Sequence, residues 1–191
     1  MTTPRFDAVG YCAHYSQQGD WAFEFSLELA RRNSIRLNLF HFLSDPYDPH
    51  DQCGRSMTRA ERSELVIERE KELRFYYEPK LGDFLDAGFR LCEDHEWTEL
   101  HQCLTRREFQ VLVLPYVAPG SSFGGKPIEQ FAGCFVCPVV LVGPDSRSEY
   151  RLNQPAALLA ERFGLTCPAM SDSNIQVAQD LAPASAAAMF T

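Results

Sequence analysis

Between residues 6 and 143 the chain alternates between two hydrophobic periods. Short apolar runs, typical of buried strands, occupy 6–13, 36–43, 88–92, 111–114 and 138–142. Between them, apolar residues recur at every third or fourth position, which predicts helices over 21–32, 59–77, 96–107 and 127–135. Residues 111–114 are apolar throughout, as expected of a strand covered on both faces of a parallel sheet.

This alternation predicts an α/β fold: a doubly wound sheet of five parallel strands with helices on both faces. In such sheets ligands bind at the carboxyl ends of the strands, where the strand order reverses. We expect residues 1–144 to form this domain. Residues 145–191 are expected to be an irregular C-terminal extension, partly helical or loose, because the chain is rich in Ala, Ser and Pro from Pro168 onward.

Local signals predict where two of the helices begin and where one of them ends. Asp20 is a good N-cap for the first helix, and Thr58 with Glu61 forms a capping box for the second. Pro79 predicts that the second helix ends near Tyr77, because the residue before a proline disfavours the helical conformation.

The net charge limits the classes of partner. The chain of 191 residues has a formal net charge of −8, which argues against general binding of nucleic acids or anionic membranes. No apolar run approaches the roughly 20 residues of a membrane span, and the first six residues lack the apolar core of a secretory signal. The seven cysteines are odd in number. We therefore expect a cytoplasmic protein with reduced thiols.

A glycine-rich loop, 120–126, lies between a buried strand and a helix. Its spacing, from Gly120 to Gly125 and Lys126, matches a Walker A loop as far as the lysine, but Pro127 replaces the hydroxyl residue that holds magnesium. Free N–H groups and Lys126 could bind a phosphate or another anion. Alternatively, the glycines make a tight turn and Lys126 is solvated.

Other chemistry has weaker sequence support. Cys134 and Cys137 form a C-x-x-C pair at the end of a helix, where the dipole opposes thiolate formation. The loop 48–53 gathers ligand types, and His95 and His101 add two more, but no second cysteine or histidine pair completes a zinc site. No G-x-S-x-G elbow is present. We predict neither a metal site nor a hydrolase triad.

Several segments in this order resemble one family. Residues 13–16 (AHYS), 25–32 (FSLELARR) and 37–42 (LNLFHF) resemble the opening β-α-β unit of the universal stress protein family. Residues 111–114 and 137–142 (CPVVLV) resemble its fourth and closing strands. The resemblance implies the strand order 3-2-1-4-5, dimerisation along the last strand (138–142), and a stress-response or regulatory role. It also implies that one branch of the family binds ATP.

The sequence departs from the ATP-binding pattern of that family. His14 stands at the acidic position after the first strand, Pro115 at the first loop glycine, and Gly124 with Gly125 at the pair that should end in a hydroxyl residue. The resemblance and the loop together imply a candidate nucleotide site comprising Ala13, His14, Phe42, Gly120, Gly124, Gly125 and Lys126.

Two of these residues can be interpreted in two ways. His14 is either a ligand contact that titrates near neutrality or a loop histidine with a backbone partner. Phe42 either stacks on a base or fills the pocket. His41, on the same strand, is interpreted as structural.

We expect a non-catalytic stress-response or regulatory module that forms a homodimer and binds an adenine nucleotide or another anion at the strand carboxyl ends. One alternative is a weak ATP hydrolase that uses the glycine-rich loop. The other is an interaction module with a protein partner and no small ligand. The C-terminal extension, including 158–163, covers the last strand or exchanges onto a partner in this hypothesis.

Overall fold

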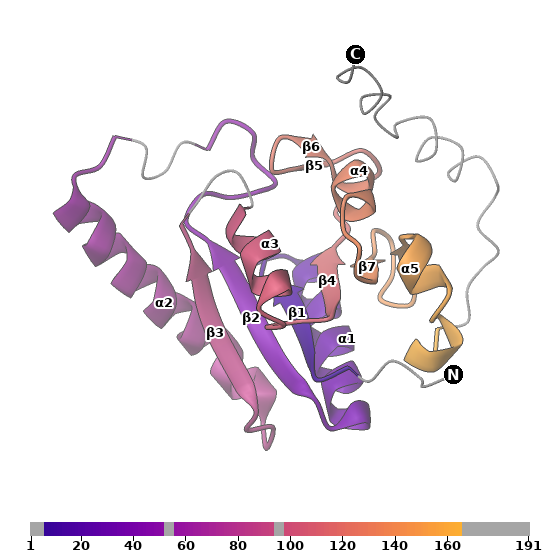
Figure 1. The fold of residues 1–191 in the computed structure, drawn as a ribbon. Helices are drawn as coiled ribbons and strands as arrows, with labels where there is room; N and C mark the ends of the chain where they lie inside the picture. Colours follow the sequence, from indigo (N-terminus) through magenta and orange to yellow (C-terminus); the bar gives the residue numbers. More distant parts are fainter. Residues whose placement is uncertain (1–5, 52–55, 94–97, 166–191) are drawn as a thin grey trace, which may run out of the picture.

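A single six-stranded sheet forms the centre of the molecule (Figure 1). The computed structural model describes residues 6–51, 56–93 and 98–165. The strand order is β3-β2-β1-β4-β7-β8. The strands of the sheet are β1 (Ala8–Cys12), β2 (Arg36–Phe42), β3 (Ala87–Cys92), β4 (Val111–Pro115), β7 (Val139–Val142) and β8 (Tyr150–Leu152).

The predicted fold class is confirmed. Five of the six strands are parallel and follow the expected order, and β8 adds an antiparallel strand beside β7. The longer helices are α1 (Gln17–Asn33), α2 (Arg59–Leu81) and α3 (Thr98–Thr105). The shorter ones are α4 (Ile128–Gly133), α5 (Gln154–Ala157) and the 3-10 turn η1 (Glu161–Phe163). Among the described residues, no helix is long and apolar enough to cross a bilayer.

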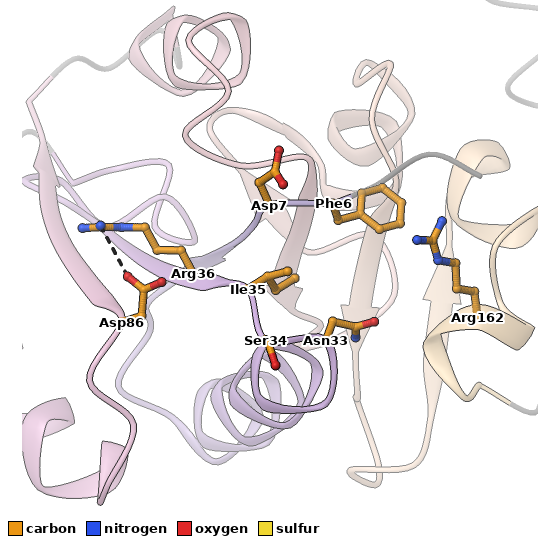
Figure 2. Close-up of a pocket in the computed structure, with 8 residues that line it drawn as sticks. All are labelled: Phe6, Asp7, Asn33, Ser34, Ile35, Arg36, Asp86 and Arg162. Atoms are coloured by element: carbon orange, nitrogen blue, oxygen red, sulfur yellow. Dashed lines mark ion pairs between the residues drawn. The ribbon is translucent and has the colours of Figure 1, made fainter. Parts of the chain in front are cut away.

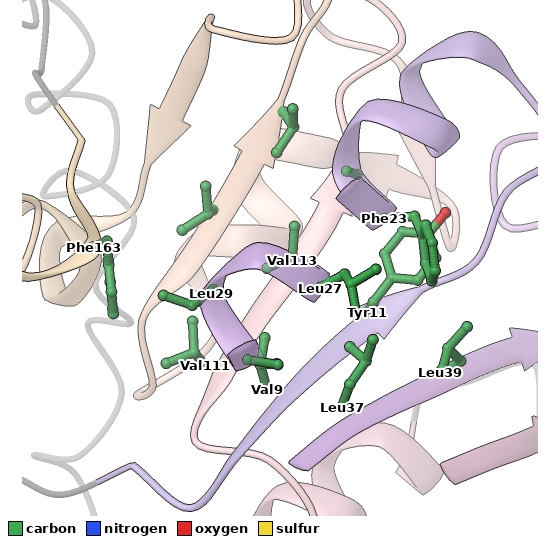
Figure 3. Packing of buried hydrophobic residues seen from close by; sticks show 14 of the residues in the cluster. Val9, Tyr11, Phe23, Leu27, Leu29, Leu37, Leu39, Val111, Val113 and Phe163 are labelled. Carbon is green, nitrogen blue, oxygen red and sulfur yellow. The ribbon is translucent and has the colours of Figure 1, made fainter. Parts of the chain in front are cut away.

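The core consists of two apolar clusters, one on each face of the sheet. Val9 and Tyr11 of β1 point toward α1 and α2, whereas Cys12 belongs to the cluster covered by α3 and α4. Figure 3 shows the first cluster, in which strand and α1 side chains interdigitate. Successive strand residues point to opposite faces, so the uninterrupted apolar runs of the sequence are explained by burial on both sides.

Helix α1 begins earlier than its sequence predicts. Its N-cap is Ser16, whose Oγ accepts a hydrogen bond from the Gly19 N–H at 3.0 Å. The prediction of an Asp20 N-cap is therefore wrong. Asp20 lies in the first turn, where its carboxylate accepts hydrogen bonds from the Tyr76 hydroxyl at 3.0 Å and from Lys80 Nζ at 2.5 Å. Its charge therefore joins α1 to α2.

Helix α2 has the predicted capping box but a later end. Thr58 and Glu61 bond each other's backbone groups as expected. The helix passes through Pro79 and ends at Leu81, so the prediction of an end near Tyr77 is wrong. Tyr77 and Leu81 are both buried one turn apart. Their burial holds the last turn in place although Pro79 lacks an N–H donor.

The glycine-rich loop forms a β-hairpin. Strands β5 (Ser122–Phe123) and β6 (Lys126–Pro127) pair in antiparallel fashion, with Gly124 and Gly125 between them. The φ angles of these glycines are 61° and 77°. A two-residue type I′ turn requires positive φ at both central positions, which explains both glycines. Helix α4 then starts at Ile128 and is shorter than the predicted 127–135.

The strand predicted to be a dimer edge is not an edge. Val140, Leu141 and Val142 of β7 pair with Leu152, Arg151 and Tyr150 of β8. The C-terminal extension therefore covers this strand within the same chain, which is one of the two arrangements expected for it, and the residues that pair with the strand are 150–152. The free edges of the described sheet are β3 and the outer side of β8.

Candidate functional site

The carboxyl ends of the strands bring several predicted site residues together. The His14 ring, after β1, lies 4.4 Å from the Tyr47 ring, and Tyr47 lies 5.0 Å from Phe123 of the hairpin (distances between centroids). Phe123 in turn meets Phe42, at the end of β2, edge to face at 6.1 Å. We call this region the rim: the ends of β1, β2 and β4, the loop 43–51 and the β5–β6 hairpin. Sequence reasoning missed Tyr47, which links the others.

Not every predicted residue faces this group. Ala13 is buried in the cluster on the α1 side, whereas Phe42 belongs to the opposite cluster. The Ala13 N–H donates to the Phe40 carbonyl at 2.7 Å, so its backbone continues the β1–β2 pairing. Lys126 is exposed on the hairpin, and a Cβ added at Gly125 would meet no atom within 4 Å. Ala13, Gly125 and Lys126 thus lie apart from the aromatic contacts.

His14 is held by side chains of two loops. Its Nδ1 lies 2.7 Å from Ser16 Oγ, the atom that caps α1, and its Nε2 lies 4.0 Å from the Asp45 carboxylate. Burial lowers the pKa of His14 below its ordinary value, and the Asp45 charge opposes that shift. The imidazole is therefore mainly neutral at pH 7, which suits a hydrogen-bonding role better than a charged contact to phosphate.

Tyr47 anchors the loop 43–51 over the end of β4. Its hydroxyl donates to the Pro115 carbonyl at 2.6 Å, and the Gly124 N–H donates to the Pro46 carbonyl at 2.8 Å. Burial raises the pKa of Tyr47 well above its ordinary value. The loop and the hairpin are thus joined through backbone groups, and an aromatic ring packs between them.

A carboxylate of the chain itself occupies the start of the glycine-rich loop. Glu129 Oε1 accepts a hydrogen bond from the Gly120 N–H at 2.9 Å and another from the Tyr116 hydroxyl. Burial and the Glu129 charge raise the pKa of Tyr116 to about 12. Further loop N–H groups donate within the chain, Ser121 to Ala118 and Ile128 to Ser121. In the described structure these donors are used by protein acceptors.

His41 lies beside the rim on the α2 side of the sheet. Its ring packs against Tyr15 at 5.2 Å, and its Nδ1 is buried with no hydrogen-bond partner among the described residues. Burial lowers the pKa of His41 to about 4, opposed by a hydrogen bond with the Ala13 backbone. This position is consistent with the structural role expected for His41. Burying Nδ1 without a hydrogen-bond partner lowers the stability of the folded state.

The two thiols of the C-x-x-C pair lie in different environments. Cys134 is exposed and Cys137 is buried, and both are free thiols. Burial raises the pKa of Cys137 to about 12, which disfavours the thiolate. Within the described ranges no group of three His, Cys, Asp or Glu could hold a metal ion. Cys53 and His95, considered above as ligand types, lie outside the described residues.

A small cavity opens at the other end of the sheet. It has a volume of about 170 Å³ and lies between the N-terminal ends of β1 and β2, the C-terminal end of α1, and η1 (Figure 2). Arg36 on its wall pairs with Asp86 at 3.5 Å, and Arg162 lies opposite. The predicted site residues do not line this cavity, so it is separate from the rim.

Comparisons with known proteins agree on the fold. No family model and no curated protein matches the chain. A protein of the universal stress protein family from Burkholderia pseudomallei aligns with a TM-score of 0.53 and 15% identity, over 74% of this chain and 98% of its own. Universal stress protein UspA from Lactobacillus plantarum aligns with a TM-score of 0.51 and 14% identity, over 74% and 100%.

A third similar structure is a universal stress protein in complex with cAMP, with a TM-score of 0.49 and 12% identity, over 74% of this chain and 100% of its own. The first two comparisons, together with the strand order, show that this chain has the universal stress protein fold. The recognition made from the sequence is confirmed at this level.

Proposed function

We propose that this chain is a non-catalytic regulatory module with the universal stress protein fold, which acts through contacts with a protein partner. A cytoplasmic location is part of the same proposal. The observation that carries it is the state of the rim: Glu129 accepts from the loop N–H of Gly120, and Tyr47 packs between the loop and the hairpin. In the described state, the Gly120 N–H and the space between the loop 43–51 and the hairpin are used by the chain itself.

The hydrolase alternative has little support from this geometry. Gly124 and Gly125 serve a hairpin turn, and Pro127 pairs with Ser122 as part of β6. A phosphate loop instead leaves its strand directly and presents a row of free N–H groups to the anion. The residues of the predicted motif are therefore arranged for a different local structure.

An adenine nucleotide or another anion at the rim is the second candidate. The specific observation that favours it is the meeting of His14, Phe42 and the hairpin at one end of the sheet, with the exposed Lys126 close by in the sequence. Binding would require the loop 43–51 to move, because Tyr47 donates to Pro115 and Gly124 to Pro46 in the described state.

Titration with ATP, ADP and AMP separates the two candidates. We expect no change in melting temperature and no heat of binding with up to millimolar nucleotide, and no nucleotide released when the purified protein is denatured and analysed by mass spectrometry. Binding in the micromolar range that Lys126→Ala weakens would overturn the first candidate and support the second. Ser148→Ala, at an exposed position of another loop, is the control for nonspecific effects.

A further inference from the structure

A serine, a histidine and an aspartate meet at the start of α1. The Nδ1 atom of His14 lies 2.7 Å from Ser16 Oγ, and its Nε2 atom lies 4.0 Å from the Asp45 carboxylate. A hydroxyl, an imidazole and a carboxylate in this order are the parts of an activated serine nucleophile. No sequence motif contains them, because Asp45 comes from the loop 43–51 and the other two follow β1.

The Asp45 carboxylate indicates which ring nitrogen of His14 carries the proton. A carboxylate only accepts hydrogen bonds, so its place beside Nε2 favours the tautomer that is protonated there. The Nδ1 atom is then an acceptor, and the Ser16 hydroxyl donates to it. Burial lowers the pKa of His14, so the ring is mainly neutral at pH 7 and able to take this proton.

The backbone between the two side chains is tightly held. The Ser16 N–H donates to the His14 carbonyl at 3.0 Å. A Cβ added at Gly19 would lie 1.8 Å from that carbonyl oxygen, so only glycine fits against it. Tyr47 packs on the His14 ring. Ser16 itself is partly exposed and the next residue, Gln17, is exposed, so a small reagent from solvent can reach the hydroxyl.

The first turn of α1 offers N–H groups beside this hydroxyl. The Asp20 N–H donates to the Ser16 carbonyl. Among the described residues, the N–H groups of Gln17 and Gln18 have no acceptor, as is usual at a helix start. Such groups stabilise the negative oxygen that forms when a hydroxyl attacks a carbonyl. The Asp20 carboxylate, which would oppose this charge, is paired with Lys80.

We propose that Ser16 is a site of covalent acylation by esters and thioesters that have a good leaving group. Ser16 Oγ attacks the acyl carbon and its proton passes to His14 Nδ1. The new O–C bond forms as the bond to the leaving group breaks, and the leaving group takes the proton from His14. The chain then carries one acyl group. This modification goes beyond the proposed function and does not depend on it.

Acylation would change the cap of α1. The Gly19 N–H donates to Ser16 Oγ at 3.0 Å, and an ester oxygen is a weaker acceptor than a hydroxyl. The same turn carries Asp20, which accepts hydrogen bonds from Tyr76 and Lys80 of α2. We therefore expect the amide of Gly19 to exchange faster with solvent in the acylated chain than in the parent.

Reaction with 4-nitrophenyl acetate tests the proposal. The parent for this experiment is the Cys134→Ala variant, because the exposed thiol of Cys134 would also take the acetyl group. We expect peptide mapping by mass spectrometry to find one acetyl group on Ser16. It should form at least about tenfold faster than any acetyl group on Ser148, an exposed serine of another loop.

Two variants separate the nucleophile from its base. His14→Gln keeps an acceptor for the Ser16 hydroxyl but removes the base, and should slow acetylation of Ser16 about 100-fold. Ser16→Asn keeps an N-cap residue and should take no acetyl group at that position. Ser148→Ala is the control and should leave the rate at Ser16 unchanged. Equal rates at Ser16 and Ser148 in the parent, or an unchanged rate in His14→Gln, would overturn the proposal.

Discussion

The two sides of the sheet, β3 on one and the β7–β8 pair on the other, are protected from further strand pairing in different ways. The β3 edge is partly exposed and carries charge: Arg90 donates to both oxygens of Glu108, and the Arg74 guanidinium of α2 lies 4.7 Å from the Phe89 ring centroid. Strand β7 has four apolar residues and no charge, and the chain turns back to cover it. Charge protects an edge strand from pairing, so the uncharged strand is the one that needs a cover.

We expect the largest effect at Phe163, a buried residue of the segment 144–165 that covers β7. Phe163→Ala should lower the free energy of unfolding by about 3–4 kcal/mol, as for other buried aromatic residues. Leu91→Ala, at a partly buried position of β3, should cost about 1 kcal/mol. Urea unfolding of both variants measures the difference. Equal costs would mean that the two edges are equally packed.

We expect a smaller effect at Asn153, whose side chain hydrogen-bonds the segment that covers β7 to Val139 and Cys137. Asn153→Asp removes the amide donors and places a charge near carbonyl oxygens, which should cost about 1–3 kcal/mol. It should also speed hydrogen exchange of 150–152 before other amides. Gln154→Ala, at the exposed neighbouring position, should change stability by less than about 0.5 kcal/mol. If the two variants behave alike, the Asn153 contacts do not hold β8.

At the open edge, charge should matter more for solubility than for stability. Arg90→Val removes two hydrogen bonds to Glu108, but both side chains are partly exposed, so solvent screening limits the cost to about 1 kcal/mol. We expect concentration-dependent association in light scattering, because the edge becomes apolar. A variant that stays a single chain at high concentration would contradict the role given to this charge.

The smallest effect belongs to the outer face of α2. The Phe75 side chain is 84% exposed, so Phe75→Ser should change the free energy of unfolding by less than about 0.5 kcal/mol. Thermal unfolding provides the measurement. A loss above about 1 kcal/mol would show that this face of the helix is packed, and the β3 edge would then be covered rather than partly exposed.

The parallel sheet could be predicted because its signal is local. Residues 37–42 and 111–114 place buried apolar side chains on both faces of the sheet, and this pattern indicates parallel strands covered by helices on both sides. The helix ends were harder. Ser16 and Asp20 are both good N-cap residues. Which of them begins α1 depends on the path of the chain after the end of β1, and the local sequence does not contain that path.

The rim, and the segment 144–165 that covers β7, are formed by contacts between residues far apart in the sequence, which local sequence patterns do not predict. Strand β8 has three residues, too few for any periodicity, and its place follows from the Asn153 contacts to Val139 and Cys137. The partners of Gly120 and Gly124 are likewise set by folding. His14 and Phe42 both lie at the rim, but they are connected only through Tyr47 and Phe123, and Tyr47 comes from a loop with no motif.

The carboxylate at the start of the glycine-rich loop differs from a bound ligand in one respect. Glu129 is part of the polypeptide, so this negative group is present at a fixed ratio of one per chain. A diffusible metabolite in that place would make the fold report on its concentration. A tethered carboxylate does not vary in this way, so the Gly120–Glu129 contact itself is independent of the concentration of any small molecule.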